Sequence, residues 1–219
     1  MGIKYGIIAG TPFDTKLGEV FFREKGLDVI SAKISENADQ QNNLQYSSPA
    51  ELEIITIDTI KELKAAGAEI IIIYCNSLSA VLEIEKISAL AEIPIITPLD
   101  VYHKLDLSRL EKLAVLAANS QSAAKIENII AANNAHLEFV TAGIMPIVNS
   151  IEAQKDPGEI LAELGLKELL LSFKSMGADT ILLGCTHLPY LKKEIMEIYE
   201  FVIDPADKMI EMAEKILNK

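Results

Sequence analysis

The sequence contains two closely similar stretches, GAEIIIIYCNSL at residues 67–78 and GADTILLGCTHL at residues 177–188. Each begins with Gly-Ala and an acidic residue, continues through an apolar run, and reaches a cysteine followed by small polar residues. Cys75 and Cys185 lie 110 residues apart in a chain of 219 residues. Because this separation is half the chain length, it indicates an internal duplication.

The pattern around these stretches alternates between strands and helices. Residues 69–75 are almost continuously apolar, which is typical of a parallel strand covered on both faces. For the helix at 48–67, Ser48 is a suitable N-cap, Pro49 suits the first turn and Gly67 suits the stop. The other strands are expected at 5–10, 27–34, 92–98, 112–118, 137–143, 179–185 and 199–205, and the other helices at 121–134 and 160–177. Such alternation predicts parallel sheets with helices outside.

Further landmarks repeat at nearly the same offset. Lys4 before the first strand matches Lys112, and Pro98 matches Pro205. Matched strands alone could reflect constraints of the fold, but the matched cysteines argue for a duplicated unit.

We therefore predict an α/β fold made of two pseudo-symmetric Rossmann-like halves. Each half is a mostly parallel sheet flanked by helices, and the active site is expected in the cleft between them. Residues 1–98 would form the first half, completed by a C-terminal helix at 206–219, and residues 99–205 the second.

Composition narrows the class of protein. The formal charge is −12, which disfavours a general binder of nucleic-acid backbones because such proteins need a basic stripe. No apolar run approaches the ~18 residues of a membrane span, and the N-terminus lacks the pattern of a signal peptide. We expect a cytoplasmic protein with reduced thiols and no nucleic-acid or membrane partner.

The two cysteines occupy the position where open parallel sheets bind ligands, beyond the carboxyl ends of the strands. A thiol acts as base or nucleophile in its thiolate form, which a helix N-terminus or a cation favours, and each cysteine precedes a possible helix start. Two opposed thiols could remove a proton from one face of a carbon and return one to the other, with no cofactor. Simple packing of buried cysteines is the alternative. A disulfide is disfavoured by the compartment, and a metal site by the shortage of further ligands.

The residues around the two cysteines resemble the motifs of a known family. YCNSLSA (74–80) and LGCTHLPYL (183–191) are similar to the two signature motifs of the aspartate/glutamate racemase superfamily, itself a duplicated α/β fold. The resemblance implies cofactor-independent racemisation of an acidic amino acid, with Cys75 and Cys185 as the two acid/base residues. It also implies a homodimer, and neither a cofactor nor a metal is expected.

The same resemblance assigns supporting roles. Asn76, Ser77 and Thr186 would bind the α-carboxylate and amino group of the substrate, and His187 would tune Cys185 or act beside it. AANSQSAAKI (117–126) resembles the substrate loop of the second half, with Asn119 and Ser122 at its polar positions. The alternatives are a structural histidine at 187 and a helix cap near 119.

The sequence departs from the family pattern in two places. Glutamate racemases carry Asp-Ser-Gly directly after the first strand, whereas this chain has AGTPFDTKLG (9–18), which partly resembles the loop of aspartate racemases. Asp14 would be the acidic residue beside the first thiol, or a loop or cap residue; Thr11 or Thr15 would contact substrate. LQYSSP (44–49) replaces the family's Pro-Tyr-Gly, so the residues leave aspartate and glutamate both open.

Other functions share this scaffold. Hydantoin racemase and maleate cis-trans isomerase are alternatives, whereas malonate-type decarboxylases use one cysteine and are disfavoured by the pair. A non-catalytic module that binds an acidic metabolite would use the same residues. His103 and His136 belong to no motif and are expected to be surface or structural residues.

Overall fold

The computed structural model describes residues 2–37, 40 and 48–218. The chain divides into two compact units, one formed by Met1–Asp100 with Ala206–Lys219 and the other by Val101–Pro205. Residues 44–47 of the LQYSSP segment lie outside the described residues.

The first unit contains a four-stranded parallel sheet in the order β2-β1-β3-β4. Its strands are β1 (Lys4–Ala9), β2 (Asp28–Lys33), β3 (Ile70–Tyr74) and β4 (Ile95–Ile96). The two central strands end level with each other, because Ala9 of β1 is in register with Tyr74 of β3. The segments that follow β1 and β3 therefore leave the same edge of the sheet.

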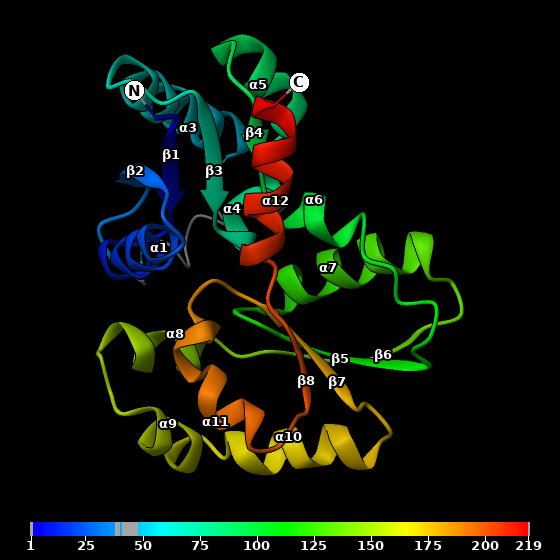
Figure 1. Ribbon diagram of the computed structural model, residues 1–219. Helices are drawn as coiled ribbons and strands as arrows, with labels where there is room; N and C mark the ends of the chain where they lie inside the picture. The colour runs from blue at the N-terminus through cyan, green and yellow to red at the C-terminus, as the bar shows by residue number, and fades with distance from the viewer. Residues whose placement is uncertain (1, 38–39, 41–47, 219) are drawn as a thin grey trace. The chain divides into compact units, whose positions relative to one another are not determined.

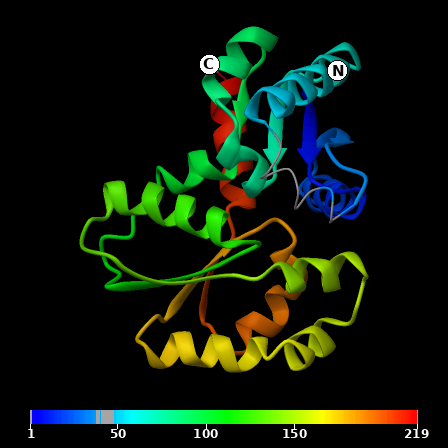
Figure 2. The ribbon, with the colours of Figure 1, turned by 180° about the vertical axis from the view of Figure 1, so that it is seen from behind.

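Helices cover both faces of this sheet, with α3 on one face and α12 on the other (Figure 1 and, from behind, Figure 2). The helix α3 begins with the predicted Ser48 cap, which forms a capping box with Glu51. On its face of the sheet Ile71 and Ile73 pack with Ile60 in one buried cluster. The helices are α1 (Pro12–Glu24), α3 (Pro49–Ala65), α4 (Asn76–Val81), α5 (Ile84–Ala91) and α12 (Ala206–Leu217); α6 (Pro98–Tyr102) has its first three residues in this unit and its last two in the other.

The second unit repeats the first. Its four parallel strands are β5 (Lys112–Ala117), β6 (Glu138–Gly143), β7 (Thr180–Gly184) and β8 (Phe201–Ile203), in the order β6-β5-β7-β8. Ala117 is in register with Gly184, as Ala9 is with Tyr74. The matching order and register confirm the predicted duplicated α/β fold with parallel sheets.

The helices of the second unit again enclose the sheet, and α7 and α10 lie on opposite faces of it (Figures 1 and 2). They are α7 (Ser120–Asn133), α8 (Met145–Glu152), α9 (Pro157–Glu163), α10 (Leu166–Ser175), the 3-10 helix η2 (Leu188–Leu191) and α11 (Lys192–Met196).

The strands β4 and β8 are shorter than the segments expected at 92–98 and 199–205. Two further differences from the sequence prediction concern helices. The single helix expected at 160–177 is wrong: the chain forms α9 and α10, and Gly165 between them has a φ of +61°. That left-handed conformation suits glycine and interrupts the helix. The segment 9–18, expected to be a loop, contains the start of α1, because Thr11 caps the helix and Pro12 occupies its first turn.

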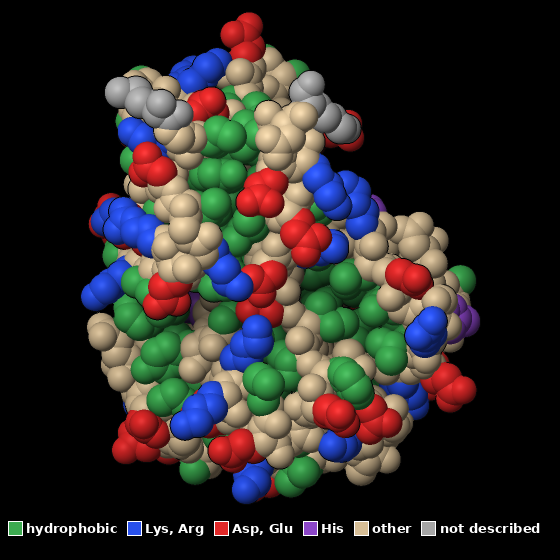
Figure 3. All heavy atoms as spheres, viewed as in Figure 1, with side chains coloured by type: hydrophobic (Ala, Val, Ile, Leu, Met, Phe, Trp, Pro, Cys, Tyr) green, Lys and Arg blue, Asp and Glu red, His purple; other side chains and the backbone are tan. Residues whose placement is uncertain are grey.

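Charged side chains of both signs are interspersed with apolar ones over the face in view in Figure 3. No helix within the described residues combines the length and apolar character needed to cross a membrane.

Candidate functional site

In each unit the predicted residues follow the two central strands. Thr11, Asp14 and Thr15 come after β1, and Cys75 comes directly after β3. Because β1 and β3 are paired and parallel, both segments start from one edge of the first sheet. The second unit repeats this arrangement after β5 and β7, with Asn119 and Ser122 after the former and Cys185, Thr186 and His187 after the latter.

Cys75 is buried, with 2% of its surface exposed, and packs in the same apolar cluster as Ile71 and Ile73. It is the N-cap residue of α4. The hydroxyl of Ser79 donates to the Cys75 carbonyl at 2.7 Å, and the Ser79 backbone N–H donates to it at 3.1 Å. These bonds hold the backbone of Cys75 at the start of α4. Asn76 is buried and Ser77 half-buried in the first turn that follows.

The start of α1 forms a buried polar network. The Asp14 backbone N–H donates to Thr11 Oγ1 at 3.1 Å, and the Gly10 N–H donates to Asp14 Oδ2 at 3.3 Å. The Thr15 hydroxyl donates to the Thr11 carbonyl at 2.6 Å. Asp14 is fully buried, so it is not the solvated loop residue that the sequence left open.

The second thiol has a defined neighbour. Cys185 Sγ lies 3.6 Å from Nδ1 of His187, and Nε2 of the same ring lies 2.5 Å from Oε1 of Glu152 at the end of α8. His187 is 1% exposed and the Glu152 side chain 15%. The three side chains form a thiol–imidazole–carboxylate row inside the second unit, in which Cys185 and His187 are buried and Glu152 is half-buried.

This row can move a proton away from Cys185. A carboxylate only accepts hydrogen bonds, so Glu152 requires the imidazole proton on Nε2. The other nitrogen, Nδ1, then faces the sulfur as an acceptor. Transfer of the thiol proton to Nδ1 produces a thiolate beside an imidazolium, whose charge Glu152 balances.

The start of α7 places the remaining predicted residues. Asn119 is the N-cap, and its Oδ1 accepts from the Ser122 backbone N–H at 2.8 Å. The predicted cap at this position is therefore present. Ser122 is buried, as is Thr186 after Cys185. The chain after Cys185 forms the 3-10 helix η2, which begins three residues beyond the cysteine, whereas α4 begins directly after Cys75.

Two residues of these networks were absent from the sequence prediction. Glu152 is one of many glutamates and stands in no recognisable motif, so only the placement of α8 reveals it. Ser35, after β2, is 2% exposed, and its hydroxyl donates to the Gly10 carbonyl at 2.7 Å. His103 and His136 are exposed, as expected.

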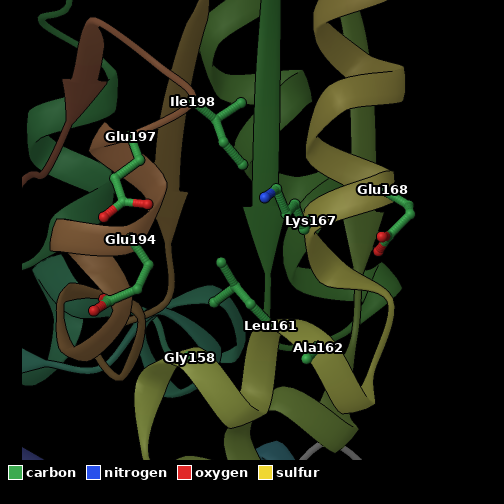
Figure 4. A pocket seen from close by; sticks show the side chains of 8 residues that line it. All are labelled: Gly158, Leu161, Ala162, Lys167, Glu168, Glu194, Glu197 and Ile198. Atoms are coloured by element: carbon green, nitrogen blue, oxygen red, sulfur yellow. The ribbon is translucent and has the colours of Figure 1, made fainter.

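A separate hollow of about 400 Å³ lies within the second unit among α9, α10 and α11 (Figure 4). The sticks in Figure 4 show Lys167 pointing between the helices. Its lining residues are Gly158, Leu161, Ala162, Lys167, Glu168, Glu194, Glu197 and Ile198. None of the predicted site residues lines it. Over the described part of the chain, no three His, Cys, Asp or Glu side chains gather in a group that could hold a metal.

Comparison with known proteins identifies the family to which this duplicated α/β chain belongs. The family model described as Asp/Glu/Hydantoin racemase matches residues 24–213. The match covers most of the sequence, so the chain belongs to the Asp/Glu/hydantoin racemase family. This confirms the resemblance seen in the cysteine motifs.

Individual relatives agree with this assignment. A glutamate racemase from Lactobacillus johnsonii is 25% identical, over 94% of this chain and 79% of its own length. The crystal structure of glutamate racemase from Francisella tularensis in complex with D-glutamate matches with a TM-score of 0.73 and 24% identity, covering 98% of this chain and 81% of that one. An aspartate racemase homologue from Pyrococcus horikoshii has a TM-score of 0.67 and 22% identity, covering 97% and 100%. At these identities the two structures bear on the fold alone.

Proposed function

We propose that the protein is an amino-acid racemase that acts on aspartate or glutamate without a cofactor, and that Cys75 and Cys185 are its two acid/base residues. The observation that carries the proposal is the row formed by Cys185, His187 and Glu152, which gives one strand-end thiol a proton acceptor. The duplicated position of Cys75 at the end of β3 supplies the second thiol.

In the proposed reaction, the thiolate of one cysteine removes the α-proton of the substrate and becomes a thiol. The electron pair of the broken C–H bond remains on the α-carbon and its carboxylate. The thiol of the other cysteine then donates its proton to the opposite face of that carbon and becomes a thiolate. One proton leaves and one returns, so the product is the enantiomer and no oxidant or reductant is needed.

The polar residues at the strand ends would hold the substrate. We assign the α-carboxylate and ammonium group to hydrogen bonds from helix starts and short side chains, which also stabilise charge that develops at the carboxylate. The hydroxyl proton of Thr15 is committed to the Thr11 carbonyl, so its oxygen serves as an acceptor. The proposed contacts are Thr11, Thr15, Asn76, Ser77, Asn119, Ser122 and Thr186.

Asp14 and His187 would support the two thiols. His187 exchanges the proton of Cys185, as the Sγ–Nδ1 distance of 3.6 Å allows. We assign Asp14 to the corresponding task beside Cys75, because it is a buried carboxylate in the segment that leaves the same sheet edge.

Both aspartate and glutamate are included as substrates. The family includes both activities by its description, and relatives described as glutamate racemase and as an aspartate racemase homologue both match over nearly the whole chain. We further propose that the protein works in the cytoplasm as a homodimer on this small substrate, with no nucleic-acid or membrane partner. Light scattering during gel filtration tests the dimer.

A chiral separation assay tests the function. Purified, dialysed protein is incubated with each enantiomer of aspartate and of glutamate, with and without added pyridoxal phosphate and with a chelator. We expect the opposite enantiomer to accumulate from one of the acids at a rate that neither addition changes. Cys75→Ser and Cys185→Ser should each abolish it, while Glu163→Gln, at an exposed ion pair with Lys155, should not. Full activity in either cysteine variant would refute the two-thiol mechanism.

A further inference from the structure

The end of β6 lies against the start of α7 more closely than a side chain would permit. A Cβ atom built on Gly143 would lie 2.0 Å from the carbonyl carbon of Asn119 and 2.3 Å from the backbone nitrogen of Ser120. Both are backbone atoms, so no side-chain rotation can relieve the overlap. The absence of a side chain at 143 therefore sets how closely the two segments approach.

The duplicated unit shows that the fold itself does not demand glycine here. Gly143 is in register with Ala117 of β5, and the corresponding partner of Ala9 in the first unit is Lys33. The next residue makes the same bond in both units: the Ile144 N–H donates to the Ala117 carbonyl at 3.0 Å, and the Ile34 N–H donates to the Ala9 carbonyl at 3.1 Å. The same strand pairing thus accommodates a lysine in one unit and has glycine in the other.

The backbone that Gly143 contacts carries a half-buried Asn119 with a fixed amide. Its Oδ1 accepts the Ser122 N–H at 2.8 Å, which caps α7 and orients the amide. With the oxygen committed, the Nδ2 group remains as a donor, and it makes no hydrogen bond to the described residues. A donor at the start of a 14-residue helix suits a carboxylate, which the helix dipole also favours.

We infer that Gly143 is a positioning residue for substrate binding. Because it has no side chain, the first turn of α7 can pack directly against the end of β6. This packing places the Asn119 amide where it can bind the substrate carboxylate. This inference rests on the proposed function and adds to it a residue outside every motif of the sequence. Gly143 acts through Asn119 and has no contact with the reacting atoms.

The size of the effect follows from the overlap. To reach an ordinary contact of 3.4 Å from 2.0 Å, the two segments must separate by about 1.4 Å. β6 is an edge strand and Gly143 is its last residue, so the strain is released by displacement of the strand end and the helix start. At that displacement the Asn119 amide loses its hydrogen bond to the substrate carboxylate, and loss of one hydrogen bond to a charged group weakens binding by roughly 10- to 150-fold. We expect Gly143→Ala to raise KM at least tenfold while kcat changes less than threefold.

A double-mutant cycle with Asn119→Ser tests the inference. Serine keeps the helix cap, but its hydroxyl ends one bond nearer the backbone, so no donor remains at the position of Nδ2. Gly6→Ala is the matched control: its Cβ would lie 2.6 Å from Ile71 Cδ1, the movable end of a side chain in the core of the first unit. Steady-state kinetics and thermal unfolding are measured for all variants. We expect Gly6→Ala to keep the wild-type KM, and the KM effect of Gly143→Ala to shrink below threefold in the Asn119→Ser background.

Three results would overturn the inference. The first is a folded Gly143→Ala protein with wild-type KM, and the second is the same rise in KM in both backgrounds. The third is an unchanged KM in Asn119→Ser alone, because Gly143 would then have no binding group to place; this result counts even if Gly143→Ala does not fold. Wild-type protein that racemises neither acid would refute the proposed function instead, so the two failures are distinguishable.

Discussion

Replacing Glu152 with glutamine removes the charge that balances the His187 imidazolium and keeps a hydrogen-bond acceptor of the same shape. His187 is buried and Glu152 half-buried, with a distance of 2.5 Å between Nε2 and Oε1. A hydrogen bond to a charged group contributes about 1.5–3 kcal/mol, against about 0.5–1.5 kcal/mol for a neutral one. The change therefore costs about 1–2 kcal/mol when the imidazolium forms, which corresponds to a roughly 5- to 30-fold lower kcat.

Two assays follow this substitution. Racemisation kinetics give kcat, and alkylation by iodoacetamide, read by peptide mass spectrometry, reports the thiolate character of each cysteine. We expect alkylation of Cys185 to slow several-fold while Cys75, in the same molecule, serves as the reference. Glu163→Gln is the control, since its exposed pair with Lys155 contributes little. A Glu152→Gln protein with kcat within twofold of wild type and unchanged Cys185 alkylation would refute the role of the carboxylate.

Three further perturbations test the fold. Burial, with a smaller contribution from Asp179, raises the pKa of Tyr199 to about 12. Because the folded state holds this proton more tightly than the unfolded state, the contribution of Tyr199 to stability is fully present below the ordinary pKa of 10.0 and is lost as pH rises through 12. Tyr199→Phe should therefore weaken the loss of stability at high pH, as measured by urea titrations. Ile72 and Leu182 are fully buried and occupy equivalent positions in the two units. Ile72→Ala and Leu182→Ala should each lower the free energy of unfolding by about 2–5 kcal/mol. A loss below about 1 kcal/mol for either would contradict the idea that the two units have equivalent cores. Gly165→Ala, at a φ of +61°, should destabilise by about 1 kcal/mol, because the left-handed conformation is unfavourable for residues with a Cβ; an increase in Tm would contradict this.

The position of the two cysteines was predictable because it depends on local pattern and on one rule of parallel sheets. An apolar run that ends in cysteine places that residue at the carboxyl edge, and the repeat at Cys185 strengthens the prediction. The Ser48 cap was predictable for a similar reason, since a capping box lies within a few residues of sequence.

The features that escaped prediction depend on less explicit signals or on tertiary structure. The start of α1 was expected to be a loop because residues 9–18 partly resemble the first loop of aspartate racemases, although Thr11 and Pro12 are a suitable cap and first turn. Gly165 lies within a helical pattern, where isolated glycines are often tolerated. Glu152 lies 35 residues from His187 in sequence, so its role requires the placement of α8. The contact of Gly143 with α7 likewise has no local signature.

Exchange of the α-proton in D₂O, followed by NMR, tests whether both cysteines act on the α-carbon of the substrate. Each enantiomer of aspartate and glutamate is incubated with wild-type protein and with the Cys75→Ser and Cys185→Ser variants. The two-thiol mechanism predicts that one of the two acids inverts in wild type with deuterium at the α-carbon of the product, and that neither variant inverts it. Inversion that persists in either variant, or no exchange with any of the four amino acids, would contradict it.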